Sequence, residues 1–114
     1  TFRVLRQYSN FACVEIEPYT GRTHQIRVHS SSLANPIFGD NKYGGGIKKS
    51  NEYANEFRRI SSRVISRFNR HALHAISIEF ELMNSNGKRL KLNSPIPDEL
   101  IELEKRLSVN ENWL

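Results

Sequence analysis

The chain has 114 residues, one cysteine and a formal net charge of +5 at pH 7. This length provides one domain with a hydrophobic core and excludes two. The single Cys13 excludes an intramolecular disulfide and predicts a reducing, cytoplasmic setting. The sequence shows neither a signal peptide nor an apolar run long enough to span a bilayer, so no membrane partner is expected.

Two strands and a helix are predicted in the first third of the chain. The stretches FRVLRQYS and FACVEIEP predict short strands, with a tight turn at Ser9-Asn10 between them. Thr23 is the expected N-cap of a helix over about residues 24–33. The stretch ANPIFGDNKYGGG then predicts turns, because its proline and glycines prevent a long regular element.

A longer helix is predicted from about Asn51 to Phe68. Apolar side chains recur along it at intervals of three and four, which predicts a buried stripe (Tyr53, Phe57, Ile60, Val64, Phe68). Another face of this helix carries a basic row, spaced four residues apart (Arg59, Arg63, Arg67). Residues 42–70 hold eight basic side chains against two acidic ones, a bias typical of proteins that bind nucleic acid. An RNA contact and a solvated helix face explain the row equally well.

The last third predicts a β-hairpin and a final helix. Apolar and polar residues alternate in AISIEFELM and in KRLKL, and NSNG between them supplies the turn. Pro95 and Pro97 end the second strand, and Asp98 and Glu99 begin a helix. The apolar face of that helix is expected to be buried (Leu100, Leu103, Leu107). The order β-β-α-loop-α-β-β-α predicts an α+β domain with a mixed or antiparallel sheet flanked by helices.

Neither a metal site nor a hydrolytic triad is predicted. The four histidines are not spaced to share one face of an element, and the sequence has no CxxC, HExxH or GxSxG motif. The two aspartates are explained by local structure, Asp40 as a turn residue and Asp98 as the start of a helix. No pair of carboxylates is therefore available for acid–base chemistry.

The stretch TGRTHQIRVH, residues 20–29, concentrates hydrogen-bond donors where a strand gives way to a helix. Arg22, His24, Gln25 and Arg27 lie beside the unpaired N–H groups of a helix start, which already favour anions. These side chains can hold phosphates, or pair with a carboxylate and keep it ionised. An arginine that caps loop carbonyls, beside histidines that pack on their neighbours, is an equally good structural explanation.

TGRTHQIRVH, NPIFGDNKYGG and RHALHA, in this order and spacing, resemble the C-terminal half of the catalytic domain of RluA-like pseudouridine synthases. LNSPIPDEL resembles that family's closing segment. The resemblance implies that residues 1–114 form the C-terminal portion of such a domain, with its fold. It also implies an enzyme that isomerises uridine to pseudouridine in structured RNA, by base flipping and without cofactor or metal. Large-subunit ribosomal RNA is the expected partner, and transfer RNA is the alternative.

The resemblance also implies roles for individual residues. Arg27 would pair with the nucleophilic aspartate of an HRLDxxTSG-like motif, which this chain lacks, and keep it ionised. Leu73 would form an apolar wall against the flipped base. The remaining donors would contact RNA at the pocket entrance (Arg22, His24, Gln25). Because the nucleophile is missing, this chain alone is expected to be inactive.

A second hypothesis is a non-catalytic RNA-binding module that keeps the synthase scaffold but has lost the nucleophile. An HRLDxxTSG-like segment upstream of Thr1 in the natural protein would favour the enzyme, and its absence would favour the module. In either case a half-domain can expose a sheet edge that its other half would cover, so we also expect non-native self-association.

Overall fold

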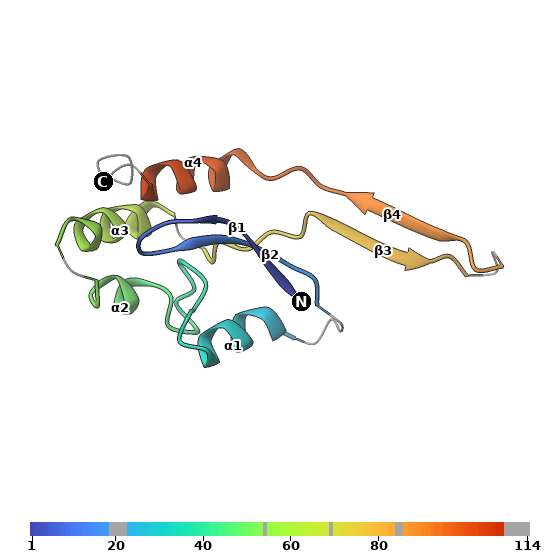
Figure 1. Ribbon diagram of the computed structural model, residues 1–114, viewed down its shortest axis with the longest axis horizontal. Coiled ribbons are helices and arrows are strands. Elements are labelled where there is room, and N and C mark those ends of the chain that lie inside the picture. Colours follow the sequence, from blue (N-terminus) through green and yellow to red (C-terminus); the bar gives the residue numbers. More distant parts are fainter. Residues whose placement is uncertain (19–22, 54, 69, 84–85, 109–114) are drawn as a thin grey trace.

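The computed structural model describes residues 1–18, 23–53, 55–68, 70–83 and 86–108 (Figure 1). Within them the chain forms four helices and two antiparallel two-stranded sheets, in the order β1-β2-α1-α2-α3-β3-β4-α4. The predicted α+β class is confirmed. The strands differ from the expectation of a single sheet, because within the described residues they form two separate hairpins. None of the described helices is long and apolar enough to cross a membrane.

The first hairpin pairs β1 (Phe2–Gln7) with β2 (Ala12–Ile16). Phe2 lies opposite Ile16 and Val4 opposite Val14, with a shift of register between Val4 and Arg6. Directly opposed residues point to the same face, so these four apolar side chains form one surface. All four are exposed, and Phe2 retains 72% of its accessible surface. No described part of the chain therefore covers this face of the hairpin.

The second hairpin pairs β3 (Ser77–Glu81) with β4 (Arg89–Asn93) and extends away from the helices (Figure 1). Ile78 lies opposite Leu92, and Phe80 lies opposite Leu90, so the alternation predicted from the sequence produces one apolar face. These side chains are exposed as well. A two-stranded hairpin with no covered face is marginally stable in water, so contact of this apolar face with another surface would stabilise it.

The core lies between α3 (Asn55–Arg67) and α4 (Asp98–Leu107). Val64 of α3 and Leu103 and Leu107 of α4 are its buried apolar residues. Other apolar side chains pack around these three (Phe11, Phe38, Phe57, Ile60, Phe68, Ala72, Leu100). The stripes predicted for both helices are confirmed at these positions.

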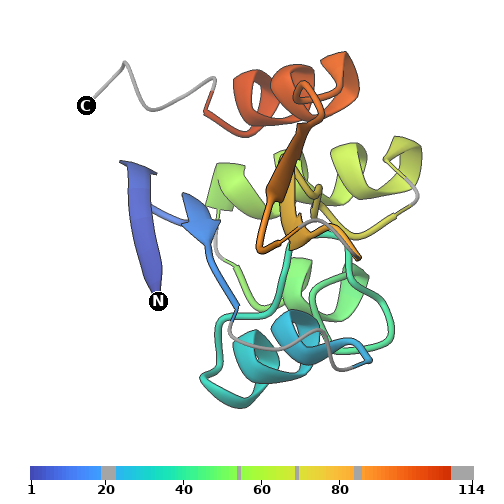
Figure 2. The same ribbon diagram turned by 90° about the vertical axis from the view of Figure 1, so that its right-hand side faces the viewer.

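The helices α4, α3, α2 and α1 follow one another from top to bottom in both views (Figure 1 and Figure 2). The short helix α2 (Ile47–Ser50) follows the glycine run and was not expected from the sequence. Its last residue, Ser50, packs against α3, so α2 connects the α3–α4 core to the loop that precedes it. Helix α3 begins four residues later than predicted, and Tyr53 lies just before it, with its ring 4.8 Å from that of Phe57.

Candidate functional site

Helix α1 (Gln25–Ser32) carries Arg27 in its first turn, and its N-cap is His24. His24 adopts a left-handed backbone conformation (φ 54°, ψ 23°), and its carbonyl accepts a hydrogen bond from the N–H of Val28 at 2.9 Å. The prediction that Thr23 caps this helix was therefore wrong. A left-handed backbone is uncommon for a residue with a side chain. The helix begins at the next residue, Gln25.

Arg27 donates two parallel hydrogen bonds to the carboxylate of Asp40. Its Nε lies 2.8 Å from Oδ2, and its Nη2 lies 2.8 Å from Oδ1. The side chain of Asp40 is fully buried, and that of Arg27 is 14% exposed. A guanidinium bound along one edge by both oxygens of a carboxylate is fixed in position and in the tilt of its plane. Asp40 therefore sets the orientation of Arg27.

The same pair fixes the charge of both groups. The hydrogen bond from Arg27 lowers the pKa of Asp40 below its usual value, against burial, which raises it. That bond likewise raises the pKa of Arg27. Asp40 is therefore ionised at neutral pH, and both of its oxygens accept hydrogen bonds from Arg27. A carboxylate held in this way is a poor nucleophile, so the expectation that Asp40 does not replace the missing aspartate is consistent with its geometry.

The ring of Tyr43 lies against the guanidinium of Arg27. The guanidinium carbon of Arg27 lies 5.0 Å from the ring centroid, within the range of a cation–π interaction. The hydroxyl of Tyr43 lies 2.9 Å from Nδ1 of His24, and its carbonyl accepts a hydrogen bond from the Ser31 hydroxyl at 2.8 Å. Tyr43 therefore ties both ends of α1 to the loop that carries Asp40.

Two glycines shape that loop. The N–H of Gly39 bonds to the carbonyl of Gly45 at 2.8 Å, and the N–H of Gly45 bonds to the carbonyl of Asp40 at 2.8 Å. A Cβ on Gly39 would collide with the carbonyl oxygen of Arg70, and one on Gly45 would collide with that of Ile37. The loop is thus too tight for side chains at these two positions, and it presents Asp40 to α1.

Residues 70–73 close the site from another side, because the N–H of Ala72 bonds to the carbonyl of Phe38 at 2.8 Å. Burial lowers the pKa of the neighbouring His71, and the positive charge of Arg27 lowers it further. His71 is therefore uncharged near neutral pH. Leu73 is half-buried in this segment, and its carbonyl accepts a hydrogen bond from Nη2 of Arg70 at 2.9 Å. Its role as a wall against a flipped base stays a prediction.

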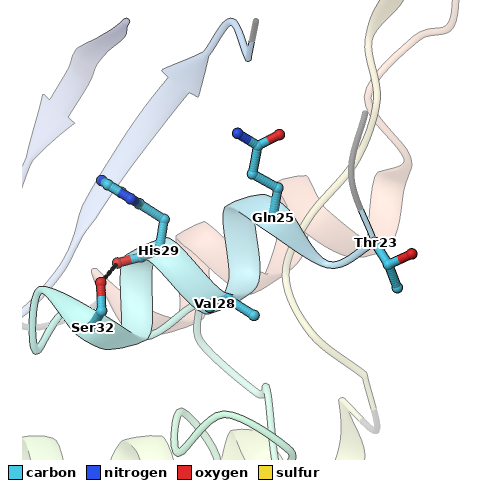
Figure 3. A pocket seen from close by; sticks show the side chains of 5 residues that line it. All are labelled: Thr23, Gln25, Val28, His29 and Ser32. Atoms are coloured by element: carbon cyan, nitrogen blue, oxygen red, sulfur yellow. Dashed lines mark hydrogen bonds between the residues drawn. The ribbon is translucent and has the colours of Figure 1, made fainter. Parts of the chain in front are cut away.

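The structure describes two of the three residues predicted to contact RNA at the entrance, His24 and Gln25, and they line different features. Arg22 lies outside the described residues. His24 bonds to Tyr43, on the side of α1 that meets the loop. Gln25 lines a different feature, a shallow open pocket of about 310 Å³ that also includes Thr23, Val28, His29 and Ser32 (Figure 3). Their contact with RNA stays a prediction.

The pocket lies along the outer side of α1. Figure 3 shows Gln25 and His29 projecting from the same side of the helix, as residues four apart do, and the hydroxyl of Ser32 bonds to the carbonyl of His29 at 2.7 Å. Among the described residues, no group of three or more histidine, cysteine or acidic side chains lies close enough to hold a metal ion. The pocket therefore offers polar side chains without a metal cluster.

The basic row of α3 lies on the surface. Arg59, Arg63 and Arg67 all belong to this helix and are all exposed. One of them, Arg59, pairs with Glu56 of the same helix at 2.6 Å. The other two remain exposed cations beside the buried Val64 stripe. Their placement is compatible with an RNA contact, which stays a prediction.

The pairing of Arg27 with Asp40 within this chain was not expected from the sequence. Asp40 does accept a bond from its own loop, the N–H of Tyr43 at 3.4 Å, as a turn residue would, but its main partner is Arg27. The motifs GDNKYGG and RHALHA contain Asp40, Tyr43 and His71, so these motifs were the sequence signal for the residues around Arg27. Pairing of Arg27 with a second aspartate, outside this chain, stays a prediction.

A model of the RNA pseudouridylate synthase family matches residues 1–32. That range contains all of the TGRTHQIRVH stretch and therefore Arg27. The chain is also similar to proteins named ribosomal large subunit pseudouridine synthase D over most of its length. It is 32% identical to the one from Haemophilus influenzae over 109 residues, which are 96% of this chain and 32% of that protein. It is 35% identical to the one from Vibrio vulnificus over 106 residues, 93% of this chain and 31% of that protein.

An uncharacterised RNA pseudouridine synthase from Chlorobaculum parvum is 30% identical over 105 residues, 91% of this chain and 32% of that protein. The chain thus spans about a third of the length of the curated relatives it matches. These similarities extend over both halves of the Arg27–Asp40 site and over both helices of the core. Over more than nine-tenths of its own length, the chain is thus similar to a part of RNA pseudouridine synthases.

Proposed function

We propose that the chain is the C-terminal part of the catalytic domain of an enzyme that isomerises uridine to pseudouridine in structured RNA. The proposed substrate is large-subunit ribosomal RNA, and the proposed location is the cytoplasm. Support for the substrate comes from the names of the relatives that match more than nine-tenths of this chain. No cofactor or metal is needed, because a carboxylate nucleophile and positioned polar groups are sufficient for the chemistry.

The reaction exchanges one bond of the nucleoside for another. An aspartate supplied from outside this chain attacks the nucleoside, and the bond between ribose and N1 of the base breaks. A bond between ribose and C5 then forms, and the bond to the aspartate breaks, which regenerates the carboxylate. The hydrogen on C5 leaves as a proton, and N1 gains one, so that the product is an isomer of the substrate. Arg27 would hold that aspartate ionised and in line, since a positive charge a few ångströms away favours the charged form.

The observation that carries this proposal is the way Arg27 is held. An arginine that binds RNA phosphates must present its guanidinium to the RNA backbone at the surface of the protein. Arg27 is mostly buried, and one edge of its guanidinium is already bound to Asp40. A second carboxylate of the same domain can reach the remaining N–H groups more readily than a phosphate on a bulky RNA backbone. The geometry therefore favours a catalytic partner over a phosphate clamp.

Release of tritium from RNA labelled at C5 of uridine tests the proposal. The natural full-length protein that contains this chain should release tritium from large-subunit ribosomal RNA, and the isolated chain should not. Turnover by the isolated chain would contradict the missing-nucleophile interpretation. Binding of RNA by the full-length protein without any release would favour the non-catalytic module, and release from transfer RNA alone would contradict the ribosomal substrate.

A further inference from the structure

We propose that Asp40 is a positioning residue of the synthase, which aims the edge of the Arg27 guanidinium that Asp40 does not bind at the nucleophilic carboxylate. This inference rests on the proposed function, because it concerns the same reaction. It adds a second carboxylate to the site, one that never touches the substrate. Arg27 then bridges two carboxylates, the buried Asp40 on one edge and the nucleophile on the other.

The geometry of the guanidinium makes this bridge possible. Its five N–H groups lie in one plane in a fixed arrangement. Asp40 accepts from Nε and from one hydrogen of Nη2, so the three remaining N–H groups, on Nη1 and Nη2, point away from it. Two of these form a second edge that can bind both oxygens of another carboxylate. Because the plane is rigid, fixing one edge also fixes the other.

Asp40 is suited to this role because it cannot move easily. Its side chain is fully buried. Its backbone lies in a loop closed by the Gly39–Gly45 hydrogen bond, where a Cβ on either glycine would collide with a neighbouring carbonyl. The ring of Tyr43 adds a further contact, with its centroid 5.0 Å from the guanidinium carbon of Arg27. The site is thus preorganised before any substrate arrives.

Asp40 also balances charge. Without it, the nucleophile would face the full positive charge of Arg27, whereas the negative charge of Asp40 offsets much of it. Other charged or titratable groups face the pair as well, namely His71 from residues 70–73, His24 from the start of α1 and Tyr43 from the loop. The negative charge of Asp40 raises the pKa of His71, so an Asp40 variant should lower the pKa of His71 as well as that of the nucleophile. Both shifts in the pH profile report the charge of Asp40.

Steady-state kinetics of the full-length synthase test the proposal, with Asp40→Asn as the main variant. We expect kcat to fall by about 10²-fold with KM changed less than about twofold, since a misplaced catalytic group can lower the rate by that factor. We also expect the acid limb of the kcat profile to move to lower pH, because the uncompensated Arg27 charge lowers the pKa of the nucleophile. Asp40→Glu keeps the charge but lengthens the side chain, so it should lower kcat while leaving the acid limb in place.

Asp98→Asn is the matched control, because Asp98 is the other aspartate of this chain and is exposed at the start of α4. It should change neither kcat nor the acid limb. If Asp40 only stabilises its loop, Asp40→Asn will leave kcat per folded enzyme and the acid limb unchanged, and the proposal is wrong. Absence of turnover in the wild type would instead overturn the proposed function.

One measurement on the wild-type protein does not depend on folding of a variant. The Nε–H proton of Arg27 should exchange with water far more slowly than that of the exposed Arg63, because it is bound to a buried carboxylate. Nitrogen-15 NMR of arginine side chains resolves the two signals. Equal exchange rates would show that Asp40 does not hold Arg27, and would overturn the proposal.

Discussion

The hydroxyl groups of Ser50 and Ser61 lie 2.6 Å apart, and both residues are fully buried. This bond joins α2 to the middle of α3. Ser61→Ala would leave the Ser50 hydroxyl with only a long contact of 3.4 Å to the carbonyl of Arg58. We expect the free energy of unfolding to fall by about 1–3 kcal/mol, the usual range for a buried polar group that loses its partner.

Urea denaturation of the full-length protein measures this effect. Ser66→Ala is the matched control, because Ser66 lies in the same helix but is exposed and bonds only to the carbonyl of Arg63. Its effect should stay within about 0.5 kcal/mol. Equal effects of the two variants would show that the Ser50–Ser61 bond does not stabilise the fold.

Gly45→Ala should destabilise the loop that carries Asp40. A Cβ at this position would collide with the carbonyl of Ile37, so the backbone must move, and the carbonyl of Asp40 that bonds to the N–H of Gly45 moves with it. We expect lower stability to urea together with lower turnover. Gly44→Ala is the comparison, because Gly44 has a positive φ of 88° but open space around it.

A left-handed backbone with a Cβ costs about 1–2 kcal/mol, so Gly44→Ala should lower stability by about that amount and leave turnover per folded enzyme unchanged. Gly45→Ala should exceed it on both measures. If Gly44→Ala proves the more harmful of the two, the close approach to Ile37 is not the reason that position 45 requires glycine.

Arg27→Lys separates charge from geometry at the site. A lysine keeps the positive charge near Asp40 but cannot form two parallel hydrogen bonds on each of two edges. We expect turnover of the full-length synthase to fall by about 10²-fold, with the dissociation constant for RNA changed less than about twofold. Kinetics and filter binding on the same preparation provide both values. Equal losses in turnover and in binding would identify Arg27 as a phosphate contact.

The basic row of α3 makes a different prediction. Replacing Arg59, Arg63 and Arg67 by glutamine should weaken binding to RNA and lower the slope of log K against log salt by about two to three, if each contacts a phosphate. The value of kcat at saturating RNA should not change. Three arginines in exposed ion pairs elsewhere provide a control with the same loss of charge (Arg3, Arg89, Arg106). Similar losses for both triple variants would favour a solvated helix face.

The apolar faces of the hairpins predict the behaviour of the chain by itself. Ile78 is 60% exposed, and Phe80 and Leu92 share its face. Because exposed apolar surface of this kind drives association, the isolated chain should self-associate. Phe80→Thr combined with Leu92→Thr should shift sedimentation toward the monomer. Glu79→Gln, on the opposite face, is the control and should leave the association unchanged.

The sequence predicted those parts of the fold whose signal is local. Apolar spacing located the stripe around Val64 in α3 and the buried face of α4, and alternation located the paired residues Ile78 and Leu92. Helix α2 was not predicted, because four residues after three glycines are too few to show a helical period. Both hairpins were predicted, but their separation into two sheets was not, because alternation within a strand carries no information on whether one hairpin lies beside the other.

The sequence predicted the helix that carries Arg27 and the loop that carries Asp40 separately, without their contact. The resemblance to the family assigned Arg27 a carboxylate partner, and the loop motif contained Asp40, but nothing in the spacing of thirteen residues shows that the two side chains meet. That contact depends on the left-handed turn at His24 and on the tight loop around Gly45. Both are backbone arrangements that a pattern of residue types does not encode.

The contact of Val64 with Leu103 and Leu107 joins two helices between which the β3–β4 hairpin is an excursion. The core already holds the ends of that excursion together, so the entropy cost of closing it rises by only about 0.6 kcal/mol for each doubling of its length. Related chains can therefore carry longer or shorter hairpins here without repacking α3 against α4. An insertion in this hairpin should act on the contacts of its apolar face and leave the α3–α4 core unchanged.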